Sequence, residues 1–286
     1  MAGISKQAVH QYGKRQSGKA VTATKFFEQA DKIRKEHPKA GCRKMALDLS
    51  CKGWGRDKTE QLLLQNGYRV CYPPNFIRTT YAQHHLHYPN LIEGLELNNM
   101  NQLIQTDITY YRVKDRFYYL VFLIDVYSRR IVGYTVNSTM QAEGNIKALR
   151  MLFKTRGRDC LKSMIHHSDR GSQYIDNEYR KLLIDRGIKI SMCKEAWQNA
   201  YTERINRTIK EEYLNGWEIN SYTALNQSVA KAIRHYNTKR RHQSLQWKTP
   251  CQYESEVNKL SPEQKPKMSM YKQADVIKIK TDNKIN

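Results

Sequence analysis

Hydrophobic and polar positions along the chain follow two patterns with different periods. In the first 70 residues apolar side chains recur at helical spacing and are interrupted at Pro38, Gly53 and Gly67. This pattern predicts three short helices, over about 25–36, 42–51 and 57–67. Further along, stretches rich in β-branched and aromatic residues are separated by short turns. They predict an antiparallel meander of three strands, over residues 103–113, 116–128 and 129–137.

After residue 137, helical and strand-like stretches alternate. An amphipathic helix is predicted over about 141–155, with Ile146, Leu149 and Leu152 on one side. The elements predicted after it are a strand at 162–168, a helix at 176–187, a strand at 188–192, a long helix at 196–216 and a helix at 222–236. This order predicts an α/β fold in which a mixed sheet carries helices on both faces.

Changes in composition divide the chain into six segments. The first residues are polar without periodicity, residues 71–100 contain three prolines, and the last residues are rich in lysine. We therefore predict a mobile arm at 1–24, a small helical domain of the helix-turn-helix kind at 25–70, a linker at 71–100, the α/β core at 101–218, a C-terminal helix with a basic loop at 219–262 and a mobile lysine-rich tail at 263–286.

The charge balance narrows the class of partner. Lysine and arginine total 49 against 27 acidic residues, a formal net charge of +22. Such an excess indicates a polyanionic partner, either nucleic acid or an anionic membrane surface. The sequence shows no apolar stretch approaching the ~20 residues of a membrane-spanning helix and no signal peptide. Nucleic acid is thus the favoured partner, with no membrane association, and a cytoplasmic location at the bacterial nucleoid is expected.

The cysteines and histidines do not suggest a zinc site. None of the six cysteines forms a CxxC pair, which argues against a zinc ribbon or a redox motif. Their scattered positions fit a reducing compartment. The cluster of His84, His85 and His87 lacks a nearby cysteine pair, and we interpret it as part of a solvated loop.

Three acidic residues stand out against this basic background. Asp107 lies in the middle of the first predicted strand, where aspartate is disfavoured. Asp169 directly follows the strand predicted at 162–168, and Glu203 lies within the long predicted helix. If these two strands are neighbours, the aspartates converge with the helix of Glu203 beside them. Because Mg²⁺ prefers carboxylate oxygens and paired metal ions assist phosphoryl transfer, the three residues predict a catalytic site for Mg²⁺ or Mn²⁺.

Each acid also has an ordinary explanation. Asp107 could pair with a neighbour such as Arg112, Asp169 could form a turn before Gly171, and Glu203 could be a solvated helix residue. The joint pattern favours the catalytic interpretation. Asp125 is the main rival, and we interpret it as a structural turn acid near Arg129 and Arg130.

Basic residues near these acids are candidate DNA contacts. Arg207 and Lys210 follow Glu203 by four and seven residues, so a regular helix places all three on one face. A solvated ion pair between Glu203 and Arg207, and a lysine that balances Glu211 and Glu212, are the ordinary alternatives. In the C-terminal basic loop, the residues predicted to hold DNA phosphates are Lys239, Arg240, Arg241 and His242.

Several motifs together resemble the second-frame (OrfB) transposases of bacterial insertion sequences, which carry an integrase-type catalytic core. The matching segments are QTDITYY, LIDVYSRRIVGY, IHHSDRGSQY, WQNAYTERINRTIKEEY and YNTKRRHQSLQWKTP, within residues 30–253. The resemblance implies a ribonuclease-H-like core and a DDE triad of Asp107, Asp169 and Glu203 that binds Mg²⁺ or Mn²⁺. It also implies insertion-sequence ends and target DNA as substrates, a first-frame transposase protein as partner or fusion, and a homo-oligomer on DNA.

The sequence departs from the family pattern in two places. The stretch between Asp169 and Glu203 is slightly shorter than usual, and Gln105 occupies the position of a customary tryptophan. Two other functions remain open: a nuclease of the same fold that hydrolyses DNA without joining it, and a non-catalytic DNA-binding protein. A membrane-surface protein is a remote third, because no basic amphipathic helix with aromatic anchors is present.

Overall fold

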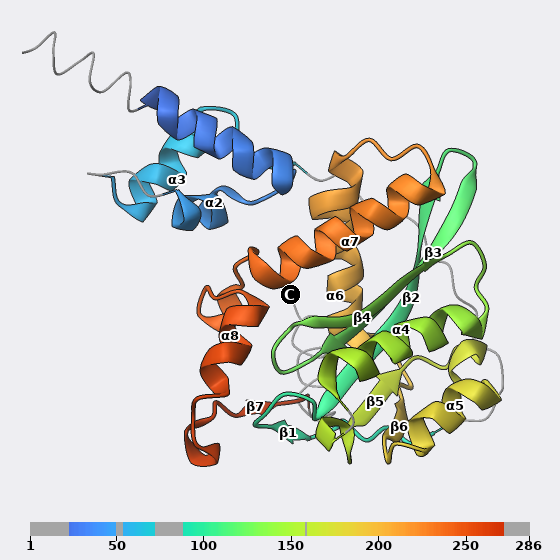
Figure 1. The fold of residues 1–286 in the computed structure, drawn as a ribbon. Helices are drawn as coiled ribbons and strands as arrows, with labels where there is room; N and C mark the ends of the chain where they lie inside the picture. The colour runs from blue at the N-terminus through green and yellow to red at the C-terminus, as the bar shows by residue number, and fades with distance from the viewer. Residues whose placement is uncertain (1–22, 50–53, 72–87, 158, 272–286) are drawn as a thin grey trace, which may run out of the picture. The chain divides into compact units, whose positions relative to one another are not determined.

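The structure, a computed structural model, describes residues 23–49, 54–71, 88–157 and 159–271. The chain divides into two compact units, Met1–Pro74 and Asn75–Asn286, which we describe separately (Figure 1). The predictions made for residues 1–22, for the histidine cluster at 84–87 and for the tail beyond residue 271 lie outside the described residues.

The first unit contains the three predicted helices, over residues 23–36, α2 (Cys42–Asp48) and α3 (Arg56–Gln65). Phe26, Met45 and Leu63, one from each helix, meet in a buried apolar cluster. The guanidinium of Arg34 donates to the carbonyls of Pro38, Ala40 and Tyr68 at 2.8, 3.0 and 2.8 Å, which fixes the turns around the first helix.

The second unit is built on a five-stranded sheet. Its strands are β2 (Leu103–Val113), β3 (Arg116–Asp125), β4 (Ile131–Asn137), β5 (Ile165–Ser168) and β6 (Lys189–Met192), in the order β4-β3-β2-β5-β6. β2, β3 and β4 form the predicted antiparallel meander, while β5 runs parallel to both β2 and β6. The strands that carry the two aspartates are therefore neighbours, as predicted.

Helices cover both faces of this sheet (Figure 1). α4 (Ala142–Arg156) and α5 (Asn177–Ile184) bury residues such as Leu149 and Leu183 against one face. α6 (Ala200–Thr208) and α7 (Tyr222–Thr238) cover the other face. Gly133 allows α4 to approach β4, because a Cβ there would lie 2.4 Å from the carbonyl oxygen of Ala148. This ribonuclease-H-like arrangement confirms the predicted fold class.

The long helix predicted at 196–216 is interrupted. A 3-10 turn (Ala196–Asn199) precedes α6, a π-helix (Ile209–Tyr213) follows it, and a second 3-10 turn ends at Gly216. Apolar periodicity cannot distinguish these turns from a regular α-helix, because they differ by one residue per turn or less.

Two segments that we predicted as linker and mobile tail are partly ordered against the core. β1 (Glu96–Leu97) pairs with β7 (Met268–Ser269), and Ile92, Leu97 and Met270 are buried. The linker prediction is thus wrong for residues 88–100, and the tail prediction is wrong for residues 263–271. Pairing between segments so distant in the sequence leaves no periodic pattern in either one.

A further helix, α8 (Pro250–Val257), lies in the segment 219–262, where we predicted only one helix followed by a basic loop. Thr249 and Gln252 form its capping box and Pro250 occupies its first turn, so a helix-start signal was present in the sequence. No helix among the described residues is long and apolar enough to span a bilayer.

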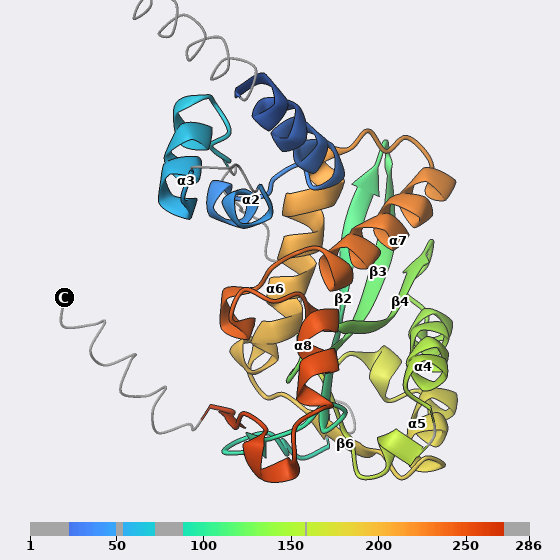
Figure 2. The ribbon, with the colours of Figure 1, turned by 60° about the vertical axis from the view of Figure 1, so that its left-hand side comes forward.

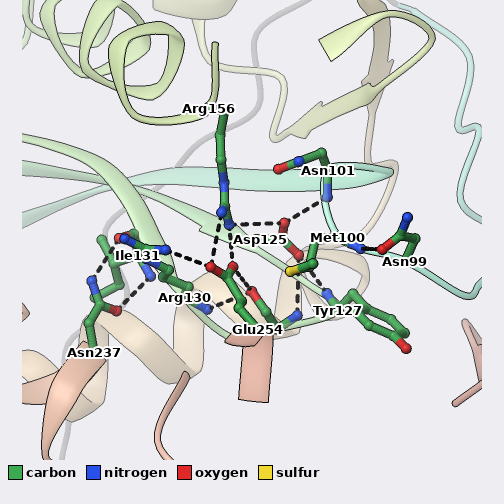
Figure 3. A network of polar contacts seen from close by, with 11 residues as sticks. Asn99, Met100, Asn101, Asp125, Tyr127, Arg130, Ile131, Arg156, Asn237 and Glu254 are labelled. Atoms are coloured by element: carbon green, nitrogen blue, oxygen red, sulfur yellow. Dashed lines mark hydrogen bonds and ion pairs between the residues drawn. The ribbon is translucent and has the colours of Figure 1, made fainter. Parts of the chain in front are cut away.

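Asp125 is a structural turn acid, as predicted (Figure 3). Its fully buried carboxylate accepts from the backbone N–H groups of Asn101, Tyr127 and Ser128. The guanidinium that pairs with it at 3.3 Å belongs to Arg156 of α4, not to Arg129 or Arg130. Arg156 and Arg130 also bind Glu254 of α8, so the network fastens the C-terminal helix to the sheet.

Candidate active site

Asp107 and Asp169 meet where β2 and β5 diverge. Gln105 of β2 lies opposite His167 of β5 in the parallel register, and each aspartate lies two residues further along its chain. β5 ends at Ser168, whereas β2 continues to Val113. The two carboxylates therefore share the notch that the shorter strand leaves beside the longer one.

Both aspartates carry an unfavourable charge in this notch. Burial raises the pKa of Asp107 to about 8, the charge of Asp169 adds to the rise, and Glu203 contributes in the same direction. The N–H of Ile108 and the ammonium of Lys210 oppose it. Burial likewise raises the pKa of Asp169, opposed by the N–H of Gly171. Two like charges in a partly buried site indicate a place that a cation would stabilise.

Glu203 lies on α6 with an exposed side chain, near enough to Asp107 to raise its pKa. Within the part of the chain that the structure describes, no three histidine, cysteine or acidic side chains stand close enough to form a complete metal-binding group. The structure thus brings the two aspartates together and places Glu203 beside them, without closing the three into one cluster.

Side chains that the sequence did not single out hold the aspartates in place. The amide of Asn206 on α6 donates to Asp107 Oδ2 at 2.8 Å. The N–H of Gly171 donates to Asp169 Oδ1 at 3.0 Å, and a Cβ at Gly171 would lie 3.0 Å from that same oxygen. Asn206 follows Glu203 by three residues, so helical spacing could have revealed that it faces the same site.

Two further amides join β2 to the turn before α6. Gln105, the buried residue at the position of the family's tryptophan, donates to the carbonyl of Gln198 at 3.2 Å. Asn199 donates to the carbonyl of Thr106 at 2.9 Å. These bonds fix the start of α6, and therefore Glu203, relative to the strand that carries Asp107.

Lys210 lies against β2 rather than in solvent. Its ammonium donates to Thr109 Oγ1 at 2.9 Å and lies 5.6 Å from the ring centre of Tyr110. Burial lowers the pKa of Lys210, and the charge of Asp107 opposes that shift. The π-helix turns Lys210 toward the strand, so the interpretation of a solvated lysine that balances Glu211 and Glu212 does not describe this geometry.

Arg207 is exposed one turn beyond Glu203. Across the described residues these two side chains form no ion pair with each other. The ordinary explanation of Arg207 as a partner for Glu203 is therefore not supported, and its guanidinium faces solvent beside the site.

Comparisons with known proteins agree with this geometry. Two family descriptions, both named integrase core domain, match residues 98–196 and 186–250. A 31 kDa protein of insertion element IS600 from Shigella sonnei is 30% identical over 228 residues, which span 77% of this chain and 83% of that protein. The transposase InsF of IS3A from Escherichia coli K12 is 30% identical over 198 residues, 68% of each chain. The chain belongs to the transposases of bacterial insertion sequences.

Other similarities are weaker or shorter. The transposase for IS904 from Lactococcus lactis is 34% identical over 172 residues, 58% of this chain and 66% of that protein. Among solved structures, the HTLV-2 integrase catalytic core domain in complex with magnesium is similar with a TM-score of 0.46 and 20% identity, over 58% of this chain and 99% of that one. A similarity this low says nothing about the reaction.

In this member of the transposase family the basic loop is partly drawn into the fold. Arg240, with a side chain only 11% exposed, forms two hydrogen bonds with the Glu212 carboxylate, at 2.7 and 2.6 Å, and lies over Tyr236. His242 is buried beside it. Lys239 is exposed, and Arg241 is half-buried and donates to the carbonyl of Trp247. These contacts hold the side chains of Arg240 and His242 within the loop, and their predicted contacts with DNA phosphates stay a prediction.

Proposed function

We propose that Asp107, Asp169 and Glu203 hold Mg²⁺ or Mn²⁺ and that the chain cleaves DNA at insertion-sequence ends and joins those ends to target DNA. The observation that carries this proposal is the pair of aspartates at the diverging strands, where burial and the charge of Asp169 raise the pKa of Asp107 and Lys210 only partly opposes the rise. A basic chain of +22 has ample cations elsewhere, so their scarcity at this position favours a site for metal.

The donor set fits a hard divalent cation. Carboxylate oxygens are the ligands that Mg²⁺ prefers, and it commonly takes one or two of them together with water and substrate phosphate. A site left open until DNA arrives agrees with three acids that do not form a closed cluster in the chain alone. The chemistry that such cations supply is stabilisation of the attacking and leaving oxygens of an in-line phosphoryl displacement.

The surrounding residues orient the acids and the DNA. Asn206 and Gly171 hold one oxygen of each aspartate, which leaves the remaining oxygens to face the site. The ammonium of Lys210 donates to Thr109, which follows Asp107 by two residues on β2. Lys210 is therefore positioned to hold a phosphate near the scissile bond. Arg207, Lys239 and Arg241 are proposed to contact DNA phosphates further out.

The helical unit at the N-terminus is proposed to bind DNA as a helix-turn-helix domain. Three short helices around one apolar cluster support it, and α3 exposes Arg56 and Lys58 at its start. Further proposals are a homo-oligomer on DNA, a first-frame transposase protein as partner or fusion, and action at the nucleoid in the cytoplasm.

The test supplies purified protein, with and without the first-frame product, with Mg²⁺ and labelled duplexes that end in the sequences of its own element. Pre-cleaved ends and a supercoiled plasmid serve to detect joining. We expect Asp107→Asn to abolish cleavage and joining while DNA affinity stays within about twofold. Asp185→Asn, at an exposed position at the end of α5, is the matched control and should remain active.

The alternative functions give different results in the same experiment. Cleavage by the wild type without any joined product would identify a nuclease. Binding without either reaction, in every metal, would identify a non-catalytic DNA-binding protein. Cleavage retained in Asp107→Asn would remove Asp107 from the site.

A further inference from the structure

The hairpin of β2 and β3 extends beyond helix α4 (Figures 1 and 2). It carries an aromatic surface formed by Tyr110, Phe117 and Tyr119. Tyr110 and Tyr119 lie opposite each other on the sheet face that α4 covers further down, and Phe117 follows toward the tip. Phe117 is 51% exposed and packs edge-on against Tyr110, with ring centres 5.5 Å apart. The exposed ring of Phe117, packed against the half-buried ring of Tyr110, offers a flat apolar surface for contact.

Positive charge surrounds these rings. Residues 112–116 at the tip contain three basic residues and one acid, and that acid, Asp115, pairs with Arg112. From the other side, the ammonium of Lys210 lies 5.6 Å from the ring centre of Tyr110. Aromatic faces flanked by cations are typical of surfaces on which nucleic-acid bases stack while phosphates are neutralised nearby.

Lys210 links the aromatic surface to the active site at the edge of β2. Lys210 contacts Tyr110 and also donates to Thr109, two residues from Asp107. β5 pairs with β2 over residues Leu103 to Gln105 and no further. The rest of β2, from Thr106 to Val113, therefore has no strand paired to it on the side of β5. Tyr110 follows Asp107 by three residues, so the two side chains leave opposite faces of β2, about 10 Å apart along the strand at ~3.3 Å per residue.

That separation has a counterpart in DNA. At ~3.4 Å per nucleotide of stacked strand, about 10 Å corresponds to about three nucleotides from the scissile phosphate. A base inside an intact duplex is stacked on both faces and cannot reach a protein ring. The ring pair would therefore meet a base only where the duplex has opened.

We propose that Tyr110 and Phe117 form a stacking site for an unpaired DNA base about three nucleotides from the bond that is cut or joined. This inference rests on the proposed function and adds to it that the enzyme acts on DNA opened beside the site. The base can come from the insertion-sequence end or from the target, since both offer the same aromatic face.

The experiment compares a blunt duplex with the same duplex carrying three unpaired nucleotides at one end, each with 2-aminopurine at the third position. Binding is followed in Ca²⁺, and fluorescence reports stacking. The wild type should bind the opened duplex about tenfold more tightly and quench its fluorescence, because base–aromatic stacking contributes about that factor. Phe117→Leu and Tyr110→Leu should lose the preference and the quenching, while Phe117→Tyr should retain both.

The control is Ile184→Ala, which removes an apolar side chain that is 60% exposed on α5; it should behave as the wild type. Placing 2-aminopurine in end duplexes or in target duplexes identifies the source of the base. Quenching and preference retained in Phe117→Leu would overturn the proposal. A Phe117→Leu variant that changes its oligomeric state but not its DNA binding would also overturn it, because the surface would then be a protein interface. Wild-type protein that binds no DNA at all would overturn the proposed function along with it.

Discussion

Two pairs of acids in the second unit, one buried and one partly buried, differ in how their charge is balanced. Asp125 and Glu254 lie among Arg130 and Arg156, which bind them in one network (Figure 3). The carboxylates of Asp107 and Asp169 accept hydrogen bonds from the amide of Asn206 and from two backbone N–H groups, and the ammonium of Lys210 acts on Asp107 from further away. Burial of Glu254 is outweighed by its bonds with Arg156 and Arg130, so the pKa of Glu254 is lowered. Burial raises the pKa of Asp125 despite Arg156, and it raises the pKa of Asp107 to about 8 with the charge of Asp169 adding to the rise.

The difference separates the structural role of Asp125 and Glu254 from the catalytic role that we propose for Asp107 and Asp169. An acid pair surrounded by guanidinium groups is complete within the chain and holds α8 and the β3–β4 turn together. An acid pair without such groups stabilises nothing by itself and becomes favourable only when a cation joins it. The comparison therefore predicts opposite consequences of neutralising each pair.

The largest effect is expected from Asp107→Asn. Catalysis should fall by about 10³-fold or more, since metal assistance contributes several kcal/mol to the transition state. The same change removes a like charge from the notch, so the metal-free variant should melt at a temperature equal to or above that of the wild type. Thermal melting with and without Mn²⁺ measures this: added metal should raise the wild-type Tm and leave the variant unchanged. A variant that melts well below the wild type would place Asp107 among the structural acids.

Glu254→Gln should do the reverse. It leaves the guanidinium groups of Arg156 and Arg130 without their buried partner, which costs about 3–5 kcal/mol of unfolding free energy. Urea unfolding at neutral pH measures the loss, and Glu256→Gln, at an exposed position on the same helix, should change stability by less than about 1 kcal/mol. Cleavage per folded molecule should remain near the wild-type value.

The pH dependence gives this prediction its sign. The pKa of Glu254 in the folded chain lies below its ordinary value of 4.5, so its contribution to stability is present above pH 4.5 and is lost as the pH falls through the folded pKa. The difference in unfolding free energy between wild type and Glu254→Gln should therefore shrink as the pH falls below 4.5. A difference that stays constant in that range would mean that Glu254 acts through packing rather than charge.

The sequence predicted what depends on local pattern. The strands around Asp107 and Asp125 are long enough for β-branched and aromatic residues to mark them, and an aspartate within such a strand was conspicuous. The family resemblance indicated the three acids together, and the structure places Asp107 within β2 and Asp169 directly after the neighbouring strand β5. The assignment of Asp107, Asp169 and Glu203 to the metal stays a prediction.

What the sequence did not predict depends on contacts between distant segments. In the sequence Arg156 is an ordinary basic residue at the end of a predicted helix, and only the structure shows that it pairs with Glu254 of α8. Arg240 looked like its neighbours in a basic loop, yet it forms a nearly buried ion pair with Glu212 of the π-helix. Residues 96–97 and 268–269 pair although each stretch is too short to show a strand pattern.

A smaller effect tests how the aspartates are held. Asn206→Ala removes the amide that donates to Asp107 Oδ2, and half-saturation of activity should require about 10–100 times more metal, as for other residues that orient metal ligands. Excess Mn²⁺ should restore most of the activity, because the ligands themselves remain. Asn226→Ala on α7 deletes an amide bonded only to its own helix and serves as the matched control. Loss of activity that no metal concentration restores would assign Asn206 a direct role with DNA instead.

The smallest effect distinguishes basic residues that contact DNA from those that build the loop. Each lysine that neutralises a phosphate steepens the salt dependence of binding by about 0.9 in the slope of log affinity against log salt. Lys239→Ala should therefore lower that slope by about one, with a uniform loss across DNA sequences. Arg240→Ala should leave the slope unchanged but lower the Tm, because it strands the Glu212 carboxylate in a buried position. Binding measured between about 50 and 200 mM salt, together with melting, separates the two, since a contact with DNA changes the slope and a contact within the fold changes the Tm.

A lower slope in Arg240→Ala with an unchanged Tm would mean that the guanidinium leaves Glu212 for a phosphate when DNA binds, and the loop would then belong to the DNA-binding surface.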